Sequence, residues 1–206
     1  MTLIRIIDWT CILLISIIFA SLITYLLAKL HFYFRGKTDI IEKLCAAVAD
    51  KSILQCIFYL EKYPEYVNSF SKSGYTPFLI ACAKGNTQLV RIMLKKGADV
   101  TLKSKNHESA FYLAVIHCMA HPHSRNASCI RELYYAGANI DEPNDKGLTP
   151  LQITAFFGQT PLVIWLLRKH ASTNVFPSPY AIAKSQGHLD TADILSKKYR
   201  LFAIQF

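Results

Sequence analysis

The feature that most constrains the fold is an internal repeat with a period of 33 residues. The segment GYTPFLIACAKGN covers residues 74–86, and GLTPLQITAFFGQ covers residues 147–159, which begin 73 residues later. A degenerate copy, HESAFYLAVIHC, occupies residues 107–118, and its unit is seven residues longer. A fixed period of this length indicates a solenoid, in which each unit buries its apolar face against its neighbours.

The second half of each unit repeats as well. Three segments place apolar residues at helical spacing and then close in a turn: LVRIMLKKGADV at 89–100, CIRELYYAGANI at 129–140 and LVIWLLRKHAST at 162–173. Gly97 and Gly137 stand where a helix C-cap favours a left-handed residue, and His170 takes that place in the last copy. The Thr-Pro pair of the first half is typical of a helix start, because threonine caps and proline fits the first turn. Each unit is therefore expected to be helix-turn-helix.

These residues resemble the ankyrin repeat family, whose units of about 33 residues carry a T-P-L-H-x-A signature. The corresponding segments read TPFLIA at 76–81, TPLQIT at 149–154, and more weakly SAFYLA at 109–114 and SPYAIA at 178–183. The family histidine is replaced in every copy, by Leu79, Tyr112, Gln152 and Ala181. The resemblance implies an all-α ankyrin-repeat solenoid, and loss of this structural histidine weakens single repeats without changing the fold.

We expect an ankyrin repeat domain over residues 38–206, with about five helix-turn-helix units including two caps. The expected units are about 38–70, 71–104, 105–144, 145–174 and 175–206. The first contains two amphipathic helices on either side of Asp50 and Lys51, and the last ends in a short helix. Atypical terminal units are expected because interior repeats expose apolar stacking faces.

A different kind of segment precedes the array, within residues 1–35. Residues 9–30 are apolar or small and carry no charge before Lys29. A bilayer core about 30 Å thick needs about 20 helical residues, so this stretch is long enough to span it. A cleaved signal peptide is the alternative. Signal peptides have an apolar region of about 7–15 residues that ends in a small-x-small site, whereas the apolar run in this sequence is longer and is not followed by such a site. We therefore expect one N-terminal transmembrane helix in a single-pass membrane protein.

Charge predicts the side on which the array lies. Arg5 before the span is partly balanced by Asp8, whereas four basic residues follow: Lys29, Arg35, Lys37 and Lys43. Because the basic flank tends to stay in the cytoplasm, the repeat domain is expected there. The whole chain carries 23 Lys and Arg against 14 Asp and Glu, and its six cysteines are scattered, which predicts no disulfide framework.

Metal-ligand residue types are densest in residues 117–129, within the longer unit. Cys118, His121, His123 and Cys129 offer two nitrogens and two sulfurs there. Their spacing matches no established zinc pattern, and both cysteines align with small core positions. We expect no metal and no cofactor.

Motifs of enzymes and of nucleic-acid binding are missing from the sequence. It contains no nucleophile elbow, no phosphate-binding glycine loop and no paired carboxylates in a recognisable frame. No helix-turn-helix pattern or aromatic-basic array indicates nucleic acid. The chain is thus expected not to be an enzyme, with no small-molecule substrate and no nucleic acid among its partners.

The resemblance implies a partner-binding face on the turn tips before each Thr-Pro position and on the inner side of the first helix. Mapped onto this sequence, that face comprises Lys72, Tyr75, Lys103, Lys105, His107, Glu108, Tyr112, Asp145, Lys146, Leu148 and Gln152. The expected function is a membrane-anchored ankyrin-repeat protein that binds a partner protein, for tethering or inhibition. Two alternatives are a bacterial immunity protein that neutralises a cognate toxin and a bacterial effector that acts on host membranes.

Overall fold

The computed structural model describes the backbone of residues 2–121 and 127–203; side chains are described for residues 16, 18–27, 29–30, 36–121 and 127–197. These ranges form helices and turns with a single isolated bridge, between Lys103 and Ser109, and no strand. The helices are α1 (Thr2–Ala49), α2 (Ile53–Lys62), the 3-10 helix η1 (Pro64–Asn68), α3 (Pro77–Ala83), α4 (Thr87–Lys95), α5 (Ala110–Ala120), α6 (Ser128–Tyr135), α7 (Pro150–Phe156), α8 (Thr160–Arg168), α9 (Pro179–Ser185) and α10 (Leu189–Ala203).

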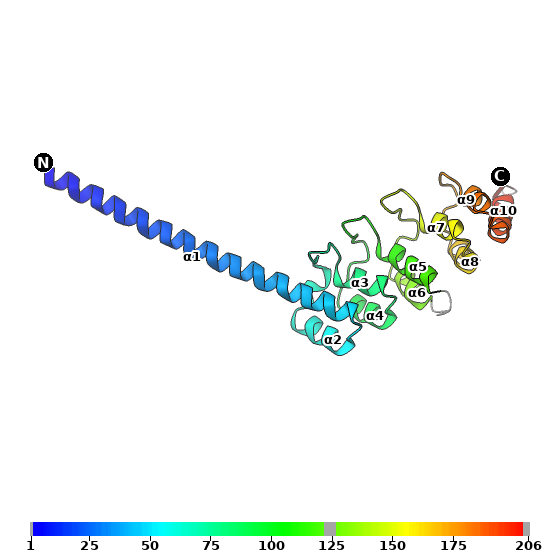
Figure 1. The fold of residues 1–206 in the computed structure, drawn as a ribbon, viewed down its shortest axis with the longest axis horizontal. Helices are drawn as coiled ribbons and strands as arrows, with labels where there is room; N and C mark the ends of the chain where they lie inside the picture. Colours follow the sequence, from blue (N-terminus) through cyan, green and yellow to red (C-terminus); the bar gives the residue numbers. More distant parts are fainter. Residues whose placement is uncertain (1, 122–126, 204–206) are drawn as a thin grey trace.

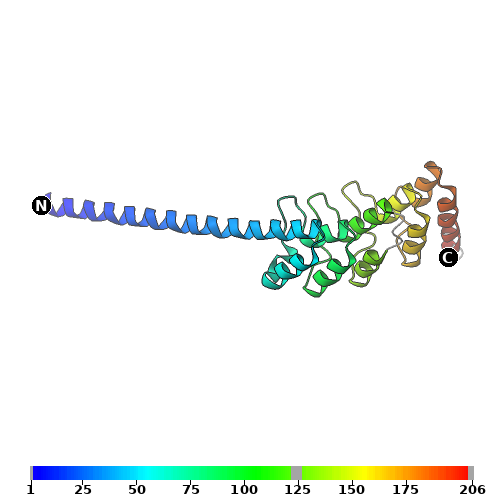
Figure 2. The ribbon, with the colours of Figure 1, turned by 60° about the horizontal axis from the view of Figure 1, so that its bottom comes forward.

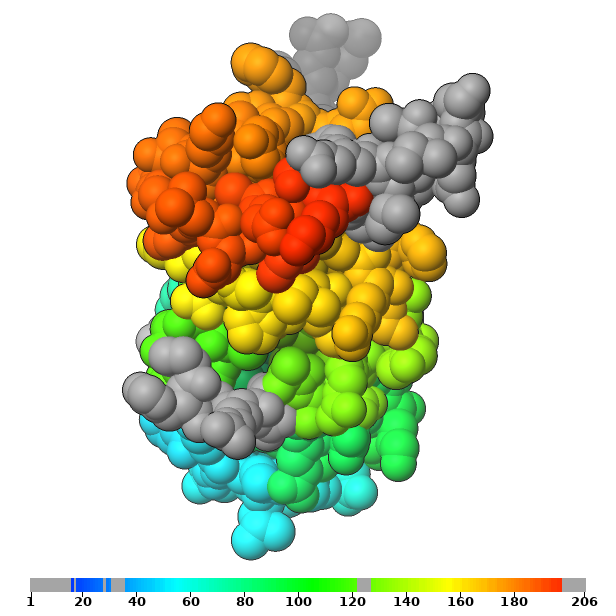
Figure 3. All heavy atoms as spheres, turned by 90° about the vertical axis from the view of Figure 1, so that its right-hand side faces the viewer, coloured from blue at the N-terminus to red at the C-terminus, as the bar shows by residue number. Residues whose placement is uncertain are grey.

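From the end of α1 onward, the helices form two rows. The inner row runs through the last turns of α1 and then α3, α5, α7 and α9, each packed on the next. The outer row holds α2, α4, α6, α8 and α10, and each of these packs against its inner partner. Figures 1 and 3 show the pairs stacked in chain order. The all-α expectation is confirmed, and the arrangement is consistent with an ankyrin solenoid.

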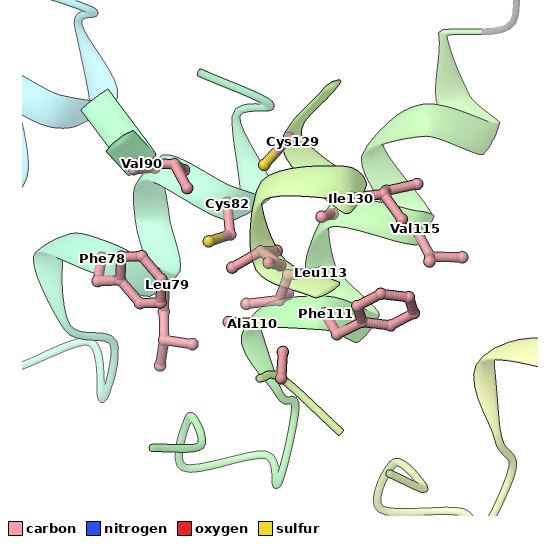
Figure 4. Packing of buried hydrophobic residues seen from close by; sticks show 14 of the residues in the cluster. Phe78, Leu79, Cys82, Val90, Ala110, Phe111, Leu113, Val115, Cys129 and Ile130 are labelled. Atoms are coloured by element: carbon pink, nitrogen blue, oxygen red, sulfur yellow. The ribbon is translucent and has the colours of Figure 1, made fainter. Parts of the chain in front are cut away.

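One continuous core runs between the two rows. Phe78 of α3, Phe111 of α5 and Leu151 of α7 occupy the same position in successive units and are at most 1% exposed. Figure 4 shows Phe78 and Phe111 among their buried neighbours from the outer helices. Burying one such side chain contributes about 1.5–3 kcal/mol, so the repeated apolar positions hold the array together.

Side-chain caps fix where the inner helices begin. In α3, α5, α7 and α9 the preceding hydroxyl accepts a bond from the backbone N–H three residues later, at 3.1–3.3 Å; these residues are Thr76, Ser109, Thr149 and Ser178. Proline occupies the first helical position of α3, α7 and α9, where its missing N–H has no intrahelical partner to lose. The Thr-Pro and Ser-Pro pairs therefore act as the sequence indicates.

Two histidines adopt the left-handed conformation that glycine adopts in the other copies. His170 follows α8 with φ 63°, where Gly97 follows α4 with φ 84°. His107 has φ 58° in the loop before α5, where Gly74 precedes α3 with φ 81°. A side chain at positive φ is strained relative to glycine, so these two turns persist because the surrounding unit imposes them.

The N-terminal helix differs from expectation, because α1 is a single helix from Thr2 to Ala49 (Figures 1 and 2). Hydropathy alone separates residues 9–30 from the first expected repeat helix. No proline interrupts this stretch, and Gly36 alone costs only about 1 kcal/mol in a helix. The helix therefore continues into the array, where Leu44 and Val48 are fully buried, while its N-terminal part projects away.

The expected span at residues 9–30 lies partly outside the described side chains. Within the part of the chain that the structure describes, no helix is both long and apolar enough to cross a membrane. The described large apolar side chains from Ile18 to Leu30 are between 42% and 63% exposed. None of them packs into the core of the array.

Candidate partner-binding face

Loops that lead from an outer helix region to the next inner helix project from one side of the array, before α3, α5, α7 and α9 (Figures 1 and 2). The first three contain the same tight turn, closed by two backbone hydrogen bonds of 2.9–3.0 Å. These bonds join Ser71 to Tyr75 and Gly74, Ser104 to Glu108 and His107, and Asn144 to Leu148 and Gly147. The repeated bonds give the three tips the same backbone geometry.

Side chains and backbone tie the first tip to the second. The Tyr75 hydroxyl donates to Glu108 Oε2 at 2.6 Å, and the Lys105 N–H donates to the Gly74 carbonyl at 3.0 Å. The Lys105 stem lies directly on Gly74, where a Cβ atom would come within 2.8 Å of it. The hydrogen bond to Glu108 raises the pKa of the Tyr75 phenol, so Tyr75 stays a neutral donor at physiological pH.

A second set of contacts ties the second loop to the third. Lys103 forms an ion pair with Glu142, and Asn144 Nδ2 donates to the Tyr112 hydroxyl at 3.3 Å. The hydrogen bond from Lys103 holds the pKa of the Glu142 carboxyl below its usual value, which favours the ionised carboxylate. Across these two sets of contacts, four residues assigned to the partner face make side-chain contacts within the protein: Tyr75, Lys103, Glu108 and Tyr112.

Gln152 has a structural place in the fourth unit. It is 1% exposed, and its Oε1 accepts from the Thr149 N–H at 2.8 Å, which completes a capping box. Its amide nitrogen also donates to the Pro177 carbonyl in the next loop, at 2.7 Å. A glutamine at the position of the family histidine thus bonds both its own helix start and the following unit.

The predicted residues fall into two groups by exposure. Five are exposed at the tips: Lys72, Lys105, His107, Asp145 and Lys146. Tyr75, Lys103, Glu108, Tyr112 and Leu148 are half-buried at the base of the loops, and Gln152 is buried. The exposed group forms the accessible part of the predicted face, and the others lie at its base.

Sequence reasoning missed the polar partners of the predicted residues. Ser104 donates to Glu108 at 2.9 Å, Glu142 pairs with Lys103, and Glu42 of α1 accepts from the Lys72 N–H at 2.6 Å. The repeat period offers a signal for some of these pairs, because Tyr75 and Glu108 are 33 residues apart. One full period places two residues at equivalent positions of neighbouring units.

The residues considered as metal ligands lie at the other end of α5 and in α6. Cys129 is buried in the core near Cys82, and Cys118 is half-buried (Figure 4 shows Cys82 and Cys129). Burial raises the pKa of the Cys118 thiol, which favours the protonated form. His121 stacks on His117 with ring centroids 4.3 Å apart, and His123 lies outside the described residues. In the described part of the chain, no three His, Cys, Asp or Glu side chains gather in a group that could hold a metal ion.

Comparison with known protein families agrees with this architecture. A profile for the ankyrin repeat matches residues 73–105, and a profile for ankyrin repeats in many copies matches residues 116–167. The solenoid therefore contains ankyrin repeats. Ankyrin repeats point to a role in protein–protein interaction.

The similar proteins are much longer than this chain. Human NAD-capped RNA hydrolase NUDT12 is 27% identical over 79 residues, which is 38% of this chain and 17% of the hydrolase. Mouse ankyrin repeat and SOCS box protein 16 is 35% identical over 105 residues, 50% of this chain and 23% of that protein. Rat ankyrin repeat and SAM domain-containing protein 6 is 33% identical over 73 residues, 35% of this chain and 8% of that protein.

The chain thus spans less than a quarter of each of these three relatives. The match to the hydrolase covers only 17% of that protein and gives no ground for assigning its activity to this chain. Toxin neutralisation and action on host membranes gain no support from these relatives and stay predictions.

Proposed function

We propose that the array is a protein-binding module whose recognition surface is the row of exposed loop tips. The observation that carries this proposal is the set of ties between neighbouring loops, from Tyr75 to Glu108 and from Lys103 to Glu142. These ties fix the relative position of the tips before a partner arrives. A preordered surface loses little conformational entropy on binding, which favours affinity.

Charge at the tips supports a polar, charged partner surface. Lys72, Lys105 and Lys146 are exposed in three successive loops, and Asp145 adds one exposed carboxylate. Complementary charge on the partner would speed association and select its orientation. Association is then expected to slow as ionic strength rises, because exposed charges are screened within about 10 Å at 0.1 M salt.

Site-specific photo-cross-linking tests this face. A photoreactive amino acid at Lys72 or at Lys146 is expected to capture the same partner. The matched control replaces Lys95, which is exposed at the end of outer helix α4, away from the loop tips. Equal capture from Lys95 and from the tips would contradict the assigned face.

We also propose that residues 9–30 tether the array to a membrane. Support comes from the apolar sequence and from the described side chains of Ile18, Leu22 and Leu26, which are at least 51% exposed. Such a helix with apolar side chains on all its faces is unfavourable in water and suits a lipid environment. Tethering would raise the local concentration of the partner without requiring tight intrinsic affinity.

Charged substitutions test the tether. Leu22→Lys combined with Leu26→Lys is expected to make the full chain extractable from membranes by a high-salt wash at neutral pH, because each lysine in a span costs about 2.5–3.5 kcal/mol. Leu54→Lys is the control, since Leu54 is 83% exposed in α2 outside the proposed span. If the unsubstituted chain is extracted as readily as the double variant, the tether is wrong.

The basic flank Arg35, Lys37 and Lys43 leads us to propose that the array faces the cytoplasm. A reporter active only in the cytoplasm, fused after Phe206, is expected to be active. A reporter that works only outside the cytoplasm serves as the reciprocal measurement, and its activity would reverse the proposed side.

A further inference from the structure

Polar side chains bridge neighbouring units at the base of the loops. We number the junctions between successive units along the chain. At the first junction, between η1 and the turn after α4, Asn68 Nδ2 donates to the Gly97 carbonyl at 2.9 Å, and Asn68 Oδ1 accepts from the Asp99 N–H at 2.8 Å. At the third junction, Asp141 Oδ1 accepts from the Ser172 N–H at 2.9 Å. These bonds join positions 29–31 residues apart and therefore link one unit to the next.

The second junction has threonine at the same position. Thr101 aligns with Asn68 and Asp141, but its hydroxyl and its N–H both donate to Asp99 Oδ1 of its own unit, at 2.6 and 2.8 Å. The groups that correspond to Gly97 and Asp99 in the next unit are the Gly137 carbonyl and the Asn139 N–H. Both residues are exposed. Thr101 therefore bonds Asp99 of its own unit and makes no bond to the Gly137 carbonyl or to the Asn139 N–H.

A pocket of about 280 Å³ lies at this junction. Its walls include Val100, Thr101, Phe111, Gly137, Asn139 and Glu142. Val100 is half-buried and contributes apolar surface to the lining, while Gly137 and Asn139 contribute polar backbone groups. The space beside Gly137 is open, since a Cβ atom placed there would meet no atom within 4 Å. The pocket therefore has room for a short side chain with a polar end.

The polar groups and charges favour one kind of occupant. A carboxamide carries one acceptor oxygen and two N–H donors, which match a backbone N–H and a carbonyl in the way that Asn68 does. A carboxylate would accept from the Asn139 N–H but would leave the Gly137 carbonyl without a donor. It would also bring a second negative charge close to the Glu142 carboxylate, which lines the pocket.

We propose that this pocket receives an asparagine or glutamine side chain of the protein partner, which supplies the bridge that Thr101 does not make. This proposal rests on the proposed protein-binding function and specifies the chemistry of the partner. The incoming carboxamide accepts from the Asn139 N–H, donates to the Gly137 carbonyl and places its methylene groups beside Val100.

The test uses the isotope-labelled full chain and N-acetyl-asparagine amide as the probe, followed by backbone amide NMR. Saturable shifts are expected at Asn139 and Gly137, with little change at Asp99, where Asn68 already occupies the equivalent position. N-acetyl-alanine amide is the matched probe without the side-chain carboxamide. Equal shifts with both probes, or no saturable shift at Asn139, overturn the proposal.

Two reciprocal substitutions make the test specific. Thr101→Asn is expected to abolish the probe shift at Asn139 and to raise the Tm by roughly 2–4 °C, the shift expected for one added net bond in a chain of this size. Asn68→Thr is expected to create a new saturable probe shift at Asp99. If Thr101→Asn leaves the probe shift at Asn139 unchanged, the pocket is not the site.

Cross-linking from Lys72 separates this proposal from the proposed function. Retained partner capture together with no response to the probe overturns only the carboxamide pocket. A normal probe response together with equal capture from Lys72 and Lys95 overturns only the tip surface. Partner capture that is weakened by Thr101→Asn at an unchanged fold supports both.

Discussion

The units α3/α4 and α5/α6 share a core but differ in their polar bonds. In the first, Pro77 opens α3, and Asn86 Oδ1 caps α4 by accepting from the Leu89 N–H at 3.1 Å. In the second, Ala110 opens α5, and Ala127 precedes α6 with no side-chain cap bond. The junction that leads into each unit also has more polar bonds in the first case. Asn68 forms a bridge to the α3/α4 unit, whereas Thr101 forms no such bridge to the α5/α6 unit.

Burial is nevertheless equal in the two units. Phe78 and Phe111 are at most 1% exposed, and so are Val90 and Ile130 in the outer helices. The comparison teaches that repeated apolar positions define the fold, while caps and bridges vary from unit to unit.

Core truncation is the largest expected effect and tests whether the two units are equally packed. Phe78→Ala and Phe111→Ala should each lower the free energy of unfolding by about 3–5 kcal/mol, through lost burial and a residual cavity. Urea denaturation followed by circular dichroism measures both. Phe58→Ala is the control, expected to change stability by about 0.5 kcal/mol or less because Phe58 is 58% exposed. A much smaller loss for Phe111→Ala would show that α5/α6 is loosely packed.

Glycine substitution separates backbone strain from close packing of neighbouring units. Gly97→Ala should lower the free energy of unfolding by about 1–2 kcal/mol through backbone strain alone, because φ is 84°. A clash adds nothing at this position, since the new Cβ would meet no neighbouring atom within 4 Å. Gly85→Ala should cost more, since its Cβ would lie 2.2 Å from the His117 ring in α5. Thermal denaturation measures the difference. Adding His117→Ala to Gly85→Ala is expected to recover the part of the stability loss that is due to the clash with the His117 ring. If the loss of stability stays the same, backbone strain alone is responsible.

Substitution of two N-cap residues compares a single cap bond at α5 with a capping box at α7. Ser109→Ala should cost about 1 kcal/mol, the typical value for an N-cap. Thr149→Ala should lower stability somewhat less, because the backbone N–H of residue 149 still donates to Gln152 Oε1 and keeps half of the capping box. Chemical denaturation of the two variants gives the comparison directly. Equal losses would indicate that the capping box adds nothing to this helix start.

The smallest expected effect is a pH dependence that originates in α5. Burial lowers the pKa of His117, and the nearby His121, Lys51 and Lys84 lower it further. The folded state then binds this proton less readily than the unfolded state, whose pKa is about 6.5. The contribution of His117 to the free energy of unfolding is fully present above about pH 6.5, and it falls as the pH drops below that value toward the lower pKa of the folded state. The urea midpoint of the His117→Asn variant should therefore change less between about pH 7.5 and pH 5.5 than that of the unsubstituted chain.

Local signals in the sequence were enough to predict much of the array. Thr76, Ser109, Thr149 and Ser178 cap the inner helices where the repeat pattern places them, and the apolar positions of each unit are buried. Both depend on residues within one or two turns of helix. Such short-range patterns are visible without knowledge of the stacking.

Contacts between units were harder to predict. Lys103 and Glu142 are 39 residues apart, since the unit between them is longer than the period, and no local pattern connects them. Tyr75 and Tyr112 stay predicted contact residues, and the sequence did not indicate that their hydroxyls bond side chains of neighbouring loops. The continuity of α1 was also missed, because hydropathy separates the two parts of the helix while its backbone has no residue that breaks it.

Helix α1 has a mechanical consequence for whatever its two ends bind. Its 48 residues extend about 72 Å at 1.5 Å per residue, without a hinge between the first turn and the array. The direction in which the array faces is therefore fixed relative to the N-terminal end of the helix. Inserting a single residue near Gly36 would turn the row of loop tips by about 100° relative to the N-terminal end, while inserting seven would nearly restore the original direction about 10 Å farther out.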